Sequence, residues 1–157
     1  MRDGSFSNAV RFLDHTFTLT NDVGKWGPWA GKVITGDEST TNIYAIDPNG
    51  VVTSFNLGIN PEDFDIIPPD QDLYCVNFHE NEPSSVLKLP RQCLANYVGD
   101  LLITQAGESG LGDVTVMFIV SWNGAGFAVR RIPVSSDFGG WFEHVTFAPL
   151  DLPAVNP

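Results

Sequence analysis

Apolar and polar residues alternate along much of this chain with a period of two. The alternation is clearest in five short runs, at residues 15–20, 42–46, 73–78, 114–120 and 127–132. A period of two places successive side chains on opposite faces of an extended strand, so these runs predict half-buried β-strands. The best helical window, residues 7–14, is short and fits a strand edge equally well. We therefore expect an all-β protein with very little helix.

Glycine, proline, asparagine and aspartate residues separate these runs at short intervals. Asn49-Gly50 and Asn123-Gly124 are typical of hairpin turns, because both residue types tolerate the positive φ angles of a type I′ turn. With these breaks, strands are expected at residues 15–20, 32–36, 43–47, 51–56, 62–67, 73–78, 86–89, 100–104, 116–121, 127–132 and 143–147. Strands of this length joined by tight turns predict antiparallel meanders.

One series of short blocks occurs twice in the same order. Each copy has an apolar strand, a Glu-Ser pair, a second apolar strand, an Asn-Gly turn and a strand led by Glu62 or Glu143. Such repeats are typical of radial β architectures, so we expect one domain of three to four propeller-like blades in an incomplete ring. The expected blade-like units lie at residues 15–58, 59–97, 98–134 and 135–157. A two-sheet β-sandwich is the alternative fold.

The chain is strongly acidic, with a net charge of -11 and only 8 lysine and arginine residues. This charge disfavours nucleic acid and anionic membranes as partners, and is compatible with cationic ligands, divalent metals or solubility alone. No signal peptide or membrane-spanning run is apparent, so the expected location is cytoplasmic by default. Cys75 and Cys93 are the two cysteines, and two buried thiols are favoured over a disulfide.

Three motifs resemble those of six-bladed β-propellers, which include NHL-repeat proteins, gluconolactonase-like proteins and soluble sugar dehydrogenases. They lie at residues 26–34, 43–50 and 61–65. Asp63 and His144 depart from the pattern, because a glycine follows the glutamate in those families. Six blades of about 40 residues need about 240 residues, which is more than the 157 present here. The resemblance therefore implies either a fragment of a larger ring or a ring completed by association of chains, and the exposed edges of an incomplete ring favour the homo-oligomer.

The resemblance also implies a divalent metal where the innermost strands begin. Glu62, Asp63, Glu143 and His144 are the candidate ligands, and Ca²⁺ is the cofactor expected of such oxygen donors. The alternative is that the two glutamates bond turn amides at the starts of strands. The three histidines lack the spacing of a zinc site, and no catalytic residues or organic cofactor are indicated.

These observations favour a non-enzymatic, self-associating interaction module with an acidic face. A small molecule or sugar is an expected ligand, and a second copy of the chain is the expected partner. The alternative, implied by the resemblance alone, is a fragment of a metal-dependent lactonase or sugar-dehydrogenase-like enzyme.

Overall fold

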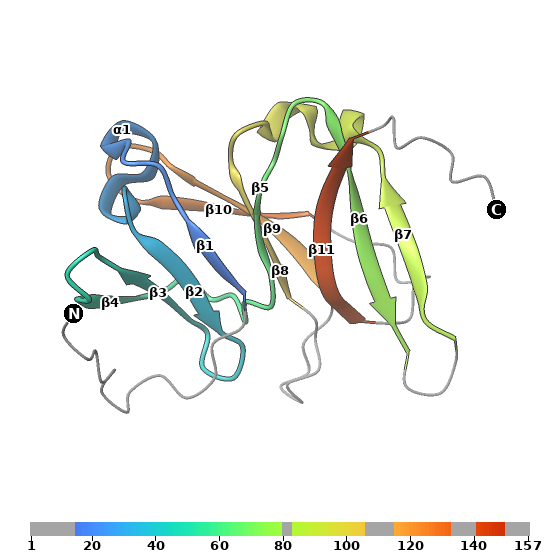
Figure 1. Cartoon of the computed structure of the whole chain (residues 1–157), viewed down its shortest axis with the longest axis horizontal. Helices are drawn as coiled ribbons and strands as arrows, with labels where there is room; N and C mark the ends of the chain where they lie inside the picture. Colours follow the sequence, from blue (N-terminus) through green and yellow to red (C-terminus); the bar gives the residue numbers. More distant parts are fainter. Residues whose placement is uncertain (1–14, 80–82, 106–114, 133–140, 150–157) are drawn as a thin grey trace.

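A computed structural model describes residues 15–79, 83–105, 115–132 and 141–149, except for the side chains of Trp141 and Glu143. These residues form strands in three antiparallel sheets (Figure 1). The strands are β1 (Thr16–Thr18), β2 (Val33–Asp37), β3 (Asn42–Ile46), β4 (Val52–Asn56), β5 (Phe64–Ile66), β6 (Gln71–Phe78), β7 (Ser85–Leu89), β8 (Leu101–Gln105), β9 (Val116–Trp122), β10 (Phe127–Ile132) and β11 (Trp141–Pro149). Each overlaps a strand expected from the sequence, and the all-β prediction is confirmed.

The three sheets lie side by side, with the second between the other two (Figure 1). The strand order is β1-β2-β3-β4 in the first sheet, β10-β9-β8-β5 in the second and β11-β6-β7 in the third. β1, β5 and β11 each end one sheet and pack near one another, so we call them the inner strands. The opposite edges are formed by β4, β10 and β7, which we call the outer strands.

The predicted grouping of strands into consecutive units is correct only for the first sheet. β5 was expected to form a unit with the next two strands, but Phe64 of β5 lies opposite Ile103 of β8. The β6–β7 hairpin instead joins β11, where Leu73 lies opposite Phe147. The hairpin has a buried face, including Leu73 and Cys75, that packs with Phe142 of β11. This distant apolar contact decides the pairing, and local alternation does not reveal it.

The two series of blocks noted in the sequence occupy corresponding places in the first two sheets. β2 and β8 are second from the inner edge, and β3 and β9 are third. Asn49-Gly50 and Asn123-Gly124 then form turns in which both glycines have positive φ, 81° and 93°, but the asparagines do not, so the expected type I′ geometry is wrong. After β4 and β10, the chain returns to the inner edge of the following sheet through β5 and β11, respectively.

Two apolar cores lie between the three sheets. The first joins the first and second sheets and includes Trp29, Ile34 and Ile103. The second joins the second and third sheets and includes Leu102 and Phe142. Successive residues of β8 therefore enter different cores, as a period of two requires, and the strand is buried throughout. Because β8 packs into both cores, the segment that pairs with the end of β8 is held in a fixed position.

The sequence did not predict three short helical segments: α1 (Val23–Trp26), η1 (Gly27–Trp29) and η2 (Arg91–Tyr97). The helical window at residues 7–14 lies outside the described residues. No described helix is long and apolar enough to cross a membrane. Both cysteines are free thiols. Cys75 is buried as expected, whereas the prediction for Cys93 is wrong because η2 buries only Leu94 and leaves Cys93 exposed.

Candidate functional site

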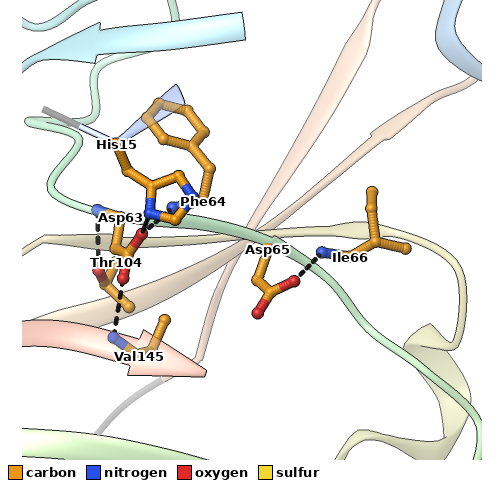
Figure 2. A network of polar contacts seen from close by, with 7 residues as sticks. All are labelled: His15, Asp63, Phe64, Asp65, Ile66, Thr104 and Val145. Atoms are coloured by element: carbon orange, nitrogen blue, oxygen red, sulfur yellow. Dashed lines mark hydrogen bonds and ion pairs between the residues drawn. The ribbon is translucent and has the colours of Figure 1, made fainter. Parts of the chain in front are cut away.

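Asp63 lies where the inner strands meet, immediately before β5, and its side chain is only 2% exposed. Its carboxylate accepts hydrogen bonds from the backbone N–H of Phe64 at 2.9 Å and of Val145, in β11, at 2.8 Å. The same carboxylate contacts Nδ1 of His15, the residue before β1 (Figure 2). One side chain therefore joins segments that belong to all three sheets.

The backbone around Asp63 is held against the end of β8. The N–H of Asp63 donates to Oγ1 of Thr104 at 3.2 Å, and the N–H of Thr104 donates to the carbonyl of Asp63 at 3.0 Å. The N–H of Glu62 donates to the carbonyl of Thr104 at 2.9 Å. On the other side, Pro61 fills the space above Gly36, where a Cβ atom would lie 2.4 Å from the proline Cγ. These contacts fix the directions in which the side chains of Glu62 and Asp63 point away from the backbone.

A pocket of 430 Å³ lies beside this network and is lined by His15, Thr16, Glu62 and His144. His15 precedes β1 and Thr16 begins it in the first sheet, Glu62 precedes β5 of the second, and His144 lies on β11 of the third. Glu62 is only 8% exposed, whereas the side chain of His15 is 43% exposed. The pocket volume falls in the range of roughly 300–1,000 Å³ that is usual for small-molecule sites.

The electrostatic environment of the pocket is acidic. Asp65 lies two residues beyond Asp63, and burial together with the neighbouring Asp63 charge raises the pKa of its carboxyl group. Burial is the larger cause of this shift, and the smaller contribution from Asp63 reflects the neighbouring negative charge. Among the described lining residues there is no lysine or arginine. When protonated, His15 is the positive group closest to Asp63, and it offsets that one charge.

The structure brings together two of the four residues predicted to bind a metal. Glu62 and His144 line the pocket. Asp63 lies beside it, but its carboxylate oxygens accept hydrogen bonds within the protein. The side chain of Glu143 lies outside the part that the structure describes. Two of the four predicted positions thus line the same pocket, and their role as metal ligands stays a prediction.

The described side chains fit a calcium ion poorly. Calcium takes six to eight oxygen ligands, whereas the described lining of this pocket presents two imidazoles, one hydroxyl and one carboxylate. Within the described residues, no three histidine, cysteine, aspartate or glutamate side chains converge in a way that could hold a metal ion. No chemical step is therefore assigned to a metal here, and calcium binding stays a prediction.

Sequence reasoning did not single out His15 and Thr16 as site residues. They come at the start of a predicted strand, and nothing in that local pattern indicates contact with residues near position 63 or 144. The contact arises because β1 and β5 are inner strands of adjacent sheets. Non-local topology of this kind has no signature in a single sequence.

Comparison with known proteins finds no family model, no curated protein and no solved structure that matches this chain. The resemblance to six-bladed propellers therefore rests on the sequence motifs alone. What the structure itself defines is an all-β protein of three antiparallel sheets with a polar pocket where their inner strands meet.

Proposed function

We propose that this chain is a non-enzymatic binding module that holds a small polar ligand in the pocket at the inner strands. The observation that carries the proposal is that the first sheet, the third sheet and the segment leading into the second sheet each contribute a polar side chain to one pocket. A ligand in this position contacts all three sheets at once, so its binding also stabilises their mutual arrangement by mass action.

The site is organised before any ligand arrives. Hydrogen bonds from Phe64, Val145 and Thr104 fix the segment around Asp63, and Asp63 in turn holds the ring of His15. Glu62 is buried, so its carboxylate has few alternative positions. Little side-chain entropy is then lost on binding, which favours affinity for a small ligand.

A pocket-filling substitution tests the proposal. Thr16 is an exposed residue of the pocket wall, so Thr16→Trp introduces a large ring without disturbing the core. Thr53→Trp, on an exposed position of β4, is the matched control. With a panel of small amines, polyols, carboxylates and calcium chloride, we expect ligand-induced increases in melting temperature in the parent and the Thr53 variant only. Equal increases in all three proteins would contradict the proposal.

The arrangement of the sheets supports a second part of the proposal, in which they act as blades of an incomplete propeller. The first and second sheets have the same order of strands outward from the inner edge, and the repeated sequence blocks lie in corresponding strands. In such a fold the inner strands surround an axis, and a pocket at their ends is where a ligand is expected.

Self-association is the third part of the proposal, with a second copy of this chain as the partner. Within the described residues, each outer strand pairs on one side only and carries an exposed valine, namely Val52 on β4, Val129 on β10 and Val86 on β7. Open strand edges with apolar side chains are prone to pair with other strands. β10 also exposes Arg130 and Arg131, which complement the acidic surface of another copy.

A further inference from the structure

We propose that the ligand of the pocket is a small organic cation that carries primary ammonium groups, such as an alkyl diamine. This inference rests on the proposed binding function of the pocket and adds the chemical class of its ligand. It is argued from the charge of the pocket, the hydrogen-bonding groups that line it and its volume.

Charge is the first argument. The carboxylate of Glu62 lines the pocket, Asp63 contacts the lining residue His15, and Asp65 interacts electrostatically with Asp63. No lysine or arginine side chain is found among the described lining residues, and the whole chain carries a net charge of -11. The field of such a protein repels anions and concentrates cations at a site lined by acidic groups.

The state of His15 is the second argument. An ionised Asp63 can only accept hydrogen bonds, so the Nδ1 atom that contacts it must carry a proton. In the neutral imidazole the remaining atom, Nε2, is then an acceptor. In its neutral form His15 can therefore accept a hydrogen bond from an N–H group of a ligand, whereas its protonated form offers a donor at Nε2.

The other lining groups offer the same chemistry. The carboxylate of Glu62 only accepts hydrogen bonds, whereas the hydroxyl of Thr16 and a neutral His144 each offer one donor as well as an acceptor. A primary ammonium group has three N–H donors and no acceptor, so it complements a site rich in acceptors. A carboxylate or phosphate ligand could accept from Thr16 and the histidines but would be repelled by the Glu62 carboxylate.

The volume of the pocket favours an organic cation over a bare metal ion. A metal ion needs ligand atoms that converge within roughly 2.0–2.6 Å. The pocket encloses 430 Å³, and the described side chains do not converge on one point. An ammonium group on an alkyl chain fills such a space while still reaching Glu62.

Three ligands of one carbon length test the assignment by isothermal titration calorimetry. They are 1,4-diaminobutane, 1,4-butanediol and succinate, which present ammonium, hydroxyl and carboxylate ends. The parent protein is expected to bind the diamine, with an affinity that falls as salt is added, and not the diol or succinate. Binding of the diol or succinate without the diamine would overturn the cation assignment and leave the proposed binding function standing. Binding of none of them, nor of any compound of the wider panel, would overturn both.

The affinities of two variants for the diamine test where it binds. Glu62→Gln keeps the shape of the side chain and removes its charge, and is expected to weaken the affinity by about tenfold or more. Asp70→Asn removes one charge from an exposed turn outside the pocket and is expected to leave the affinity within about twofold. Equal effects of the two variants would show that the diamine binds the acidic surface in general and would overturn the inference. Calcium chloride that binds in a Glu62-dependent way and displaces the diamine would assign the site to an inorganic cation instead.

Discussion

At the scale of single residues, Asp63 contributes more to holding the three sheets together than any sequence motif indicates. Its buried carboxylate accepts two backbone hydrogen bonds and contacts His15, and the segments involved belong to three sheets. Buried polar atoms that lose a partner cost free energy, because water does not replace the lost hydrogen bond. Asp63 is therefore expected to be needed for stability as well as for the shape of the pocket.

Replacing Asp63 by asparagine tests that expectation. The amide retains one acceptor oxygen but presents its NH₂ group where the second carboxylate oxygen accepted a hydrogen bond, and it loses the charge that pairs with His15. We expect a decrease of about 1–3 kcal/mol in the free energy of unfolding, measured by urea denaturation. Asp70→Asn, on the exposed turn, should change it by less than about 0.5 kcal/mol. Equal effects of the two substitutions would contradict the role of Asp63.

The two cysteines are expected to differ sharply in reactivity. Burial, with the Asp63 charge as a smaller cause, raises the pKa of the Cys75 thiol to about 12. Cys93 is exposed on η2. Because the thiolate is the reactive form, a thiol reagent at pH 8 should modify Cys93 alone in the native protein, and both residues in denaturant. Rapid modification of both thiols without denaturant, measured by mass spectrometry, would contradict the burial of Cys75.

At the scale of elements, the approach of β2 to the start of β5 positions the pocket. Gly36 has no side chain, and a Cβ atom there would lie 2.4 Å from Cγ of Pro61 and 3.0 Å from Cε2 of Phe64. The absence of a side chain lets the segment before Glu62 lie directly on the first sheet. The φ angle of Gly36 is not positive, so the backbone conformation does not require glycine at this position. The close approach of Pro61 does require it.

Gly36→Ala is therefore expected to destabilise the protein by about 1–3 kcal/mol, since one added methyl group overpacks a rigid contact. Gly126→Ala is the control, because a Cβ atom at that position has no neighbour within 4 Å. Thermal unfolding measures both variants. The packing argument fails if the melting temperature of Gly36→Ala equals that of Gly126→Ala.

The elements also show what a single sequence reveals. Alternation located the strands, because the side-chain period of a strand is local information. It did not reveal that β5 pairs with β8, because β5 is short and the β6–β7 hairpin intervenes. The short helical segments carried no helical period. Two of the lining residues, Glu62 and His144, were singled out from the sequence because they come at the start of predicted inner strands. His15 was not, because it reaches them only through the packing of separate sheets.

At the scale of the whole molecule, the outer strands should make the chain self-associate. In the described part of the chain, β4, β10 and β7 have open edges with exposed valines. Light scattering at increasing concentration is expected to give a mass above the 17.1 kDa of one chain. The double substitution Val86→Lys and Val129→Lys places charges on two of these edges and should reduce that mass. A mass of one chain for the parent protein at high micromolar concentration would contradict self-association.

The histidines offer the most direct test of the central claim, which is that the junction of the three sheets is a ligand site. The chain contains three histidines; His15 and His144 line the pocket, whereas His79 contacts Asn77 at the end of β6. Imidazole resonances can be followed by NMR while 1,4-diaminobutane, the diol, succinate or calcium is added. The account predicts that at least one of these ligands shifts the His15 and His144 resonances together and in a saturable way, with His79 unchanged. No saturable shift with any of them, or equal shifts of all three histidines, would contradict it.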